Sequence, residues 1–233
     1  MINVKTIASS SKGNCYYITD GSTPLLLEAG IKYKDIQKAL NFNTKDIAGC
    51  LITHEHGDHS KGIKDLLRVG KNVYMSQGTK ETLQLENSRI KTVKAKKQFQ
   101  IGTWTILPFE VEHDVSEPIG FLLKNKAGDK LLFATDTYYI RYKFKGLTHL
   151  LIECNYSIDI LNENIAKGRV HKGMKKRLIQ SHFSLENVKE FLTVNDLSKV
   201  QEIHLLHLSD SNSDEARFKR EVQELTGKLV FIA

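Results

Sequence analysis

Residues 53–59 read Thr-His-Glu-His-Gly-Asp-His and directly follow an apolar run, Ile-Ala-Gly-Cys-Leu-Ile. The apolar run predicts a strand buried in a sheet, and the polar run predicts a loop at the end of that strand. In an extended segment His54 and His56 point to the same side, because side chains alternate along a strand. Asp58 and His59 follow a glycine, which lets the chain turn so that they face a second ion. Imidazole and carboxylate donors at this density suit zinc, manganese or iron.

A solvated loop that happens to be rich in histidine is the alternative interpretation of this run. Three of the nine histidines in the chain fall within it. Chance accounts poorly for that concentration, so the prediction is a metal-binding loop at the end of a strand.

Composition indicates an ordinary globular protein with an anionic substrate. The 233 residues are 40% hydrophobic and 26% charged, which is enough for one large α/β domain with a substantial core. The formal net charge of +7 favours nucleic acid, nucleotides or phosphate esters. No apolar stretch approaches the ~20 residues that a membrane span needs, and the first residues resemble a strand rather than a signal peptide.

The three cysteines, Cys15, Cys50 and Cys154, lie far apart in apolar or mixed runs. An odd number of separated cysteines indicates reduced, packed thiols rather than a disulfide framework. We therefore expect a cytoplasmic protein without a membrane partner.

Short apolar runs bounded by turn residues predict many strands. We expect them at 2–8, 15–20, 24–28, 48–53, 72–76, 90–93, 98–101, 103–109, 118–124, 130–135, 148–153, 202–208 and 228–232. Apolar positions at helical spacing predict helices at 32–41, 60–69 (with Ser60 as its cap), 158–166, 170–180, 184–193 and 213–225. Many short strands with flanking helices favour two sheets between helices. Because the chain has no repeat or Pro/Gly-rich linker, we predict a single domain over residues 1–233.

Four further residues lie where a metal site would need them. His113 follows the expected strand 103–109, and Asp136 and His207 each follow an apolar strand. His182 heads a His-Phe-Ser segment at an expected helix start. Ligands gathered from strand ends form a rigid site, because strand ends are held in place while loops vary.

With these motifs the chain resembles the metallo-β-lactamase superfamily over essentially its full length. It is most similar to the compact WalJ/YycJ-type phosphodiesterase branch, which includes phage anti-Pycsar cyclic-nucleotide phosphodiesterases. More distant similarity is to the tRNase Z and RNase J nucleases. The segments that carry the resemblance are the run 53–59, the loop Ser9-Ser10-Ser11-Lys12-Gly13-Asn14, the lone His113, Ala134-Thr135-Asp136-Thr137, Glu153-Cys154-Asn155, His182-Phe183-Ser184 and His207-Leu208-Ser209.

The resemblance implies an α/β fold, the four-layer αβ/βα metallo-β-lactamase sandwich, with two mixed sheets flanked by helices. It also implies two divalent metal ions, Zn or Mn, as cofactors. His54, His56 and His113 would hold one metal. Asp58, His59 and His207 would hold the other, and Asp136 would bridge the two.

The resemblance assigns further roles outside the ligand set. Asp58 would orient the nucleophile, and His182 would contact the phosphate or protonate the leaving oxygen. Polar residues of the matching motifs are expected beside the ligands or the substrate; these are Ser11, Asn14, Ser184 and Ser209. The chain departs from many relatives at Glu28, where they have an aspartate that orients loops and ligands.

Several of these positions have a competing interpretation. His113 alone is compatible with a surface histidine, and His204 competes with His207 as the ligand from the same strand. The basic cluster within 167–177 fits a phosphate-binding face or a solvated helix equally well. The aromatic run that begins at Tyr138 fits a base-stacking wall, a dimer contact or simple packing.

The sequence thus predicts a two-metal phosphodiesterase that hydrolyses nucleotide phosphodiester bonds. Cyclic mononucleotides are the first expected substrate, because the chain lacks the large insertion or arm with which related nucleases grip a polymer. A DNA or RNA nuclease of the WalJ or RNase Z-like type is the alternative, and a thioester or lactone hydrolase is the third. A nucleotide or nucleic-acid substrate and a homodimer are the partners that the resemblance implies.

Overall fold

The computed structural model describes residues 1–233, which form two compact units. The first unit comprises Met1–Glu110 and Val115–Asp129, and the second comprises Val111–Asp114 and Lys130–Ala233. A single domain over 1–233 stays a prediction, and each unit is described by itself below.

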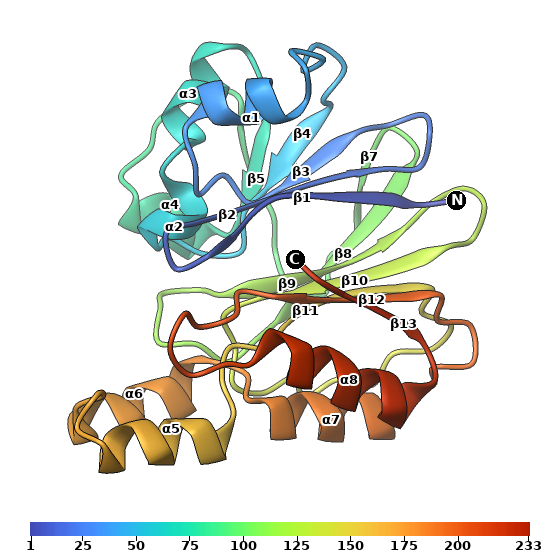
Figure 1. Ribbon diagram of the computed structural model, residues 1–233. Helices are drawn as coiled ribbons and strands as arrows, with labels where there is room; N and C mark the ends of the chain where they lie inside the picture. The colour runs from blue at the N-terminus through green and yellow to red at the C-terminus, as the bar shows by residue number, and fades with distance from the viewer. The chain divides into compact units, whose positions relative to one another are not determined.

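A six-stranded sheet forms the centre of the first unit (Figure 1). Its strands lie in chain order, with β1 to β3 antiparallel and β3 to β6 parallel. They are β1 (Asn3–Ser10), β2 (Gly13–Thr19), β3 (Leu25–Leu27), β4 (Gly49–Leu51), β5 (Val73–Met75) and β6 (Ile90–Thr92). Three further strands of this unit pair antiparallel with β8 in the middle: β7 (Phe99–Ile101), β8 (Trp104–Glu110) and β9 (Ile119–Lys124).

Helices cover one face of the six-stranded sheet and bury its apolar side chains. They are α1 (Tyr33–Ala39), α2 (Gly57–Ser60), α3 (Ile63–Arg68) and α4 (Gln77–Thr82). Ile36 of α1 and Leu66 of α3 are fully buried in one cluster with Leu26 and Cys50 of the sheet. Each such aliphatic side chain stabilises the fold by roughly 1.5–3 kcal/mol, so this cluster fixes the ends of β3 and β4 from which the polar loops emerge.

Four parallel strands form the second unit, in the order β10-β11-β12-β13. They are β10 (Lys130–Ala134), β11 (His149–Glu153), β12 (Glu202–Leu206) and β13 (Leu229–Ile232). The helices are α5 (Ile158–Ala166), α6 (Lys172–Ser181), α7 (Leu185–Val194) and α8 (Glu215–Thr226). Helix α8 contacts both β13 and α7 (Figure 1).

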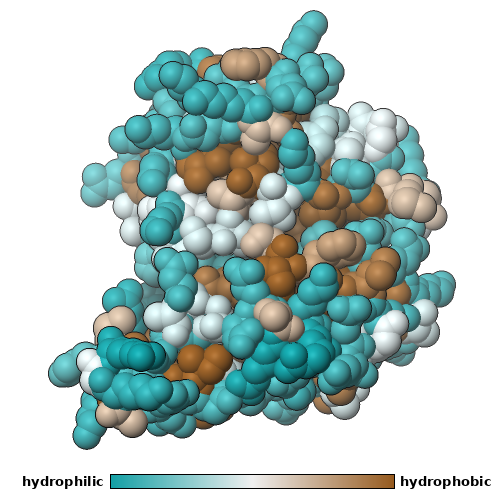
Figure 2. All heavy atoms as spheres, viewed as in Figure 1, coloured by the Kyte–Doolittle hydropathy of each residue, from teal (hydrophilic) through white to brown (hydrophobic).

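The outer surface of the second unit's helices is mostly hydrophilic. Figure 2 shows hydrophilic side chains over most of its lower edge, where α5 to α8 lie. None of the helices has the length and apolar character that crossing a membrane would require.

Every predicted strand is present, with ends shifted by at most a few residues. The helix predicted over 60–69 is present as α3, which begins at Ile63, but the predicted Ser60 cap is wrong, because Ser60 ends α2. Ser60 Oγ instead donates to the carbonyl oxygen of Glu55 at 2.9 Å, so the side chain closes the loop behind it. Helix α4 was not predicted, because its sequence, Gln-Gly-Thr-Lys-Glu-Thr, has no apolar periodicity.

Candidate metal-binding residues in the two units

The run 53–59 forms a loop and then helix α2 in the first unit. His54 is buried, and its ring centroid lies 4.8 Å from that of His56 and 4.2 Å from that of His59. Thr53 Oγ1 lies 2.9 Å from His54 Nδ1, which directs the other ring nitrogen away from the threonine. The three predicted imidazoles of the run are therefore gathered at one place.

Glu28 positions this loop through two contacts. Its carboxylate is 0% exposed and accepts hydrogen bonds from the backbone nitrogen of Thr53 at 3.2 and 3.5 Å. Glu28 Oε2 also lies 3.6 Å from His59 Nδ1. The longer glutamate thus reaches both ends of the run, as expected for a residue that orients ligands.

Asn14 completes the surroundings of His59. Its side chain is buried, and Asn14 Nδ2 lies 3.2 Å from His59 Nε2 and 3.4 Å from Asp58 Oδ2. Asp58 Oδ2 in turn lies 3.3 Å from His59 Nε2. The Asn14 amide and the carboxylates of Asp58 and Glu28 thus surround the His59 ring.

Two glycines near the run have different roles. A Cβ on Gly30 would lie 1.6 Å from the carbonyl oxygen of Asp58 and 2.5 Å from the backbone nitrogen of Asn14. Gly30 therefore lets two backbone segments meet beneath the loop. Gly57, inside the run, has no atom within 4 Å of such a Cβ and no positive φ. The prediction that this glycine is needed for the turn is not supported, because α2 starts there with ordinary backbone.

In the second unit a polar side chain follows each of three neighbouring parallel strands. Asp136 comes shortly after β10, Glu153 is the last residue of β11, and His207 directly follows β12. The carboxyl ends of parallel strands meet at one edge of a sheet, where α/β proteins bind their ligands. The strand order therefore brings these three side chains together.

The distances confirm that these side chains and His182 form one cluster. His207 Nδ1 lies 2.7 Å from Asp136 Oδ1 and 3.4 Å from Glu153 Oε1. His182 Nδ1 lies 2.6 Å from Glu153 Oε1 and 4.0 Å from Asp136 Oδ2. One donor atom from each of the four residues lies within 4.8 Å of the others.

His113 lies beside this cluster within the second unit. Its side chain is only 2% exposed, which rules out the surface-histidine interpretation. His113 Nδ1 lies 3.0 Å from the carbonyl oxygen of Ser181, and a carbonyl can only accept, so Nδ1 carries the hydrogen. The other nitrogen, Nε2, lies 4.0 Å from Asp136 Oδ2 and is the one available as a donor to a metal.

Glu153 lies in a segment that carries the family resemblance, but the sequence assigned it no role at the site. It is 0% exposed, and its Oε2 accepts hydrogen bonds from the backbone nitrogens of Thr137 at 3.1 Å and Phe183 at 3.0 Å. It thus connects the segment after Asp136 to the segment after His182. The available signal was an apolar strand that ends in a carboxylate, the pattern that did single out Asp136.

Three of these residues adopt the left-handed backbone region. The φ angles are 63° for Glu28, 46° for Asp136 and 53° for His207. Such conformations cost roughly 1–3 kcal/mol each for residues with a Cβ, and they persist where neighbouring contacts fix the side chain. In both units the sharp bend at a strand end turns a polar side chain toward its cluster.

The remaining predicted polar residues have mostly local contacts. Ser11 is exposed in the turn between β1 and β2, Ser184 Oγ caps α7 by accepting from Asn187 N, and Ser209 Oγ accepts from Asn212 N. His204 differs from His207, because its ring stacks on Phe231 at 5.0 Å and its Nε2 lies 3.1 Å from Glu202. The assignment of individual metal ligands stays a prediction.

The cysteines do not take part in either cluster. Cys15, Cys50 and Cys154 are free thiols and fully buried, and burial raises the pKa of each. A raised pKa keeps the thiol protonated and unreactive. All three are packed core residues, as predicted.

The elements and the strand-end clusters define an α/β fold with two mixed sheets flanked by helices, and the predicted fold class is confirmed. At the level of fold, the chain superposes on the metallo-beta-lactamase fold protein YhfI from Bacillus subtilis with a TM-score of 0.76 and 16% sequence identity. That superposition covers 100% of this chain and 97% of YhfI.

Sequence comparison gives the family. Residues 26–193 match the sequence family described as "Beta-lactamase superfamily domain". The chain is 29% identical to the exodeoxyribonuclease YycJ of Bacillus anthracis over 229 residues, which is 91% of this chain and 84% of that protein. It is also 29% identical to the exodeoxyribonuclease WalJ of Streptococcus pneumoniae, covering 89% of this chain and 81% of WalJ. The chain belongs to the β-lactamase superfamily, within which it is a hydrolase with the metallo-β-lactamase fold.

Proposed function

We propose that this chain is a metal-dependent phosphodiesterase that hydrolyses nucleotide phosphodiester bonds. The observation that carries the proposal is the pair of clusters, one in each unit, whose candidate donors are imidazole and carboxylate groups. The YycJ and WalJ relatives, both exodeoxyribonucleases, support the same reaction.

The donor chemistry fits divalent metal ions. Imidazole nitrogens and carboxylate oxygens suit zinc and manganese, and no thiolate lies in either cluster. We assign His54, His56, Asp58 and His59 in the first unit as ligands, with His113, Asp136 and His207 in the second. Two bound ions would activate water as a nucleophile near neutral pH and stabilise negative charge on the phosphoryl oxygens.

His182 is positioned to act on the substrate rather than to serve as a ligand. Its Nδ1 donates to Glu153 Oε1 at 2.6 Å, which fixes the orientation of the ring. The side chain is 19% exposed, whereas those of His207 and Asp136 are each 3% exposed. An imidazole that is held by a carboxylate and reachable from solvent suits contact with the phosphate or proton delivery to the leaving oxygen.

Two kinds of nucleotide phosphodiester, a DNA end and a cyclic mononucleotide, are candidate substrates. The named activity of the relatives favours a DNA end, and the exposed lysines of α6 add positive charge to the second unit. A cyclic mononucleotide is the second candidate, favoured by the absence of any inserted arm among the thirteen strands and eight helices. Both substrates contain the bond that the proposed site would cleave.

The first experiment is a hydrolysis panel with protein loaded with zinc or manganese. The substrates are 3′,5′-cyclic mononucleotides, single- and double-stranded DNA, RNA and a bis-aryl phosphodiester. Asp58→Ala serves as the inactive control, and elemental analysis records the metals that the purified protein retains. Shortening of DNA from its ends supports an exonuclease, and opening of cyclic nucleotides with intact polymers supports the second candidate.

Salt dependence gives a further discrimination. Binding to a polymer through several lysines weakens steeply as salt rises, whereas binding of a mononucleotide changes little. If neither phosphodiester class is hydrolysed but thioesters or lactones are, and His182→Ala leaves that activity intact, the proposal is wrong.

A further inference from the structure

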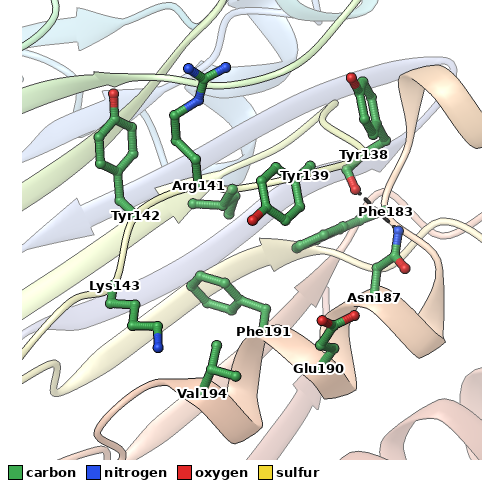
Figure 3. A pocket seen from close by; sticks show the side chains of 11 residues that line it. Tyr138, Tyr139, Arg141, Tyr142, Lys143, Phe183, Asn187, Glu190, Phe191 and Val194 are labelled. Atoms are coloured by element: carbon green, nitrogen blue, oxygen red, sulfur yellow. Dashed lines mark hydrogen bonds between the residues drawn. The ribbon is translucent and has the colours of Figure 1, made fainter.

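A cavity of about 280 Å³ lies within the second unit, beside the segments that carry Asp136 and His182. Figure 3 shows its two walls. One wall is the segment 138–143, and the other is formed by Phe183 and one face of α7. Neither wall belongs to the clusters described above.

The walls of the cavity are tied to the candidate catalytic residues. Tyr138 comes two residues after Asp136, and Phe183 directly follows His182. Asn187 Nδ2 donates to the carbonyl oxygen of Tyr138 at 3.1 Å, which joins the walls (Figure 3). A ligand in this cavity therefore lies against the segments that position Asp136 and His182.

The cavity has a fixed apolar floor and an open aromatic rim. Phe183 and Phe191 are 2% and 5% exposed, with ring centroids 6.2 Å apart, and Ile140 is 5% exposed. Tyr139 at the rim is 54% exposed (Figure 3). A packed floor with an exposed ring above it suits a flat aromatic ligand, because ring faces attract one another when offset or stacked.

Charged groups also stand at the rim. Glu190 and Lys143 line the cavity and are exposed, and Arg141 is paired with Glu112, the residue before His113. A carboxylate such as Glu190 accepts hydrogen bonds from N–H groups at the edge of a ligand. Apolar faces with one acceptor at the edge match a heteroaromatic ring that carries N–H donors.

We infer that this cavity binds the base of the nucleotide whose phosphate is cleaved. The inference rests on the proposed function, since it takes the phosphate to lie at the second unit's cluster, whose Asp136 and His182 lie next in the chain to the cavity walls. A volume near the lower limit of ligand sites, ~300 Å³, holds one base and excludes a longer stretch of polymer. The cavity therefore selects base-bearing phosphodiesters and serves a DNA end and a cyclic mononucleotide alike.

The test compares two chromogenic substrates that differ only in the base. These are the p-nitrophenyl ester of thymidine 5′-phosphate and the corresponding ester of 2-deoxyribose 5-phosphate. We expect the wild type to prefer the base-bearing ester about tenfold in kcat/KM, because base–aromatic stacking has this order of magnitude. Tyr139→Ala is expected to bring the ratio close to one through KM, and Tyr139→Phe to retain it.

A matched control removes an exposed aromatic ring elsewhere. Phe42 is 69% exposed in the first unit, and Phe42→Ala should keep the wild-type ratio. Glu190→Gln should lower the ratio less than Tyr139→Ala, since an amide still accepts one hydrogen bond. Because Tyr139 and Glu190 are exposed, these variants should fold normally, which melting temperatures verify.

The outcomes separate this inference from the proposed function. If both esters are hydrolysed at equal rates, or if Tyr139→Ala leaves the ratio unchanged, the base pocket is wrong and the phosphodiesterase stands. If neither ester is hydrolysed, calorimetric binding of thymidine 5′-monophosphate against 2-deoxyribose 5-phosphate still tests the pocket. Equal affinity for the two ligands would overturn the base pocket. A Tyr139→Ala variant that keeps its base preference would also overturn it, and loss of self-association in that variant would assign Tyr139 to a dimer contact instead.

Discussion

The first unit takes its candidate ligands from one run of seven residues, 53–59, whereas the second takes them from three separate segments around His113, Asp136 and His207. In the first unit a single loop and a short helix set the geometry, and Glu28 and Asn14 contact it from neighbouring strands. In the second unit the order of the parallel strands sets the geometry, with Glu153 connecting the segments.

The two clusters therefore depend on different kinds of contact. The first depends on the close approach of backbone beneath one loop, so a small steric change there should matter. The second depends on buried carboxylates that hold distant segments together, so loss of a charge should matter more than loss of volume. Variants at Asp136, Gly30 and Glu153 distinguish these two kinds of dependence.

The largest effect is expected at Asp136, the buried carboxylate that lies 2.7 Å from His207 and is assigned as a metal ligand of the second unit. Asp136→Asn should lower kcat/KM for a phosphodiester about a thousandfold or more, because two-metal stabilisation of the reaction supplies several kcal/mol. Elemental analysis should show less bound metal in Asp136→Asn than in the wild type. The control is Asp196→Asn, an exposed carboxylate of the same unit. Full metal content in Asp136→Asn would contradict the role of Asp136 as a ligand.

The next effect concerns stability in the first unit. Gly30→Ala should destabilise the protein by about 3 kcal/mol, since a Cβ there meets backbone that cannot move aside. Gly57→Ala, inside the histidine-rich run, should be neutral or slightly stabilising, because its Cβ meets nothing within 4 Å. Chemical denaturation measures both variants. Equal destabilisation by the two variants would show that the close backbone packing at Gly30 does not determine the stability of the first unit.

A smaller effect is expected from Glu153, which holds His182. Glu153→Gln should lower kcat by about 10- to 100-fold with bound metal retained, as is usual for residues that orient a ligand or catalytic group. The double variant Glu153→Gln/His182→Ala should be no worse than His182→Ala alone. Additive losses would assign Glu153 a role independent of His182.

The smallest effect is expected far from both clusters, between α7 and α8. Hydrogen bonds from Arg217 at 2.7 Å and Lys189 at 2.9 Å lower the pKa of Glu221. A lowered pKa contributes stability above the unfolded value of ~4.3, and this contribution is lost as pH falls through the folded value. Glu221→Gln should cost at most about 1 kcal/mol at neutral pH, because the group is partly solvated.

Denaturation curves at neutral pH and near pH 3 check this prediction. The difference between Glu221→Gln and the wild type should shrink at the lower pH. A difference that persists there would mean that packing, rather than charge, links the two helices.

The strand pattern and the first cluster were readable from the sequence because both are local. Alternating and apolar runs placed every strand, and the run 53–59 holds its donors within one turn of chain. In the second cluster Asp136 and His207 were recognisable as polar residues after apolar strands. The predicted cap at Ser60 was wrong, since the serine hydroxyl donates to the carbonyl oxygen of Glu55 and the helix begins only at Ile63.

Tertiary structure alone decided what depends on residues far apart in the chain. It assigned Glu153 to hold His182, made Gly30 rather than Gly57 the sterically required glycine, and brought Tyr139, Phe183 and Phe191 around one cavity. These features arise where strand ends and helix faces converge. A sequence records the periodicity of each element, but the distance between two elements follows only from how their apolar faces pack.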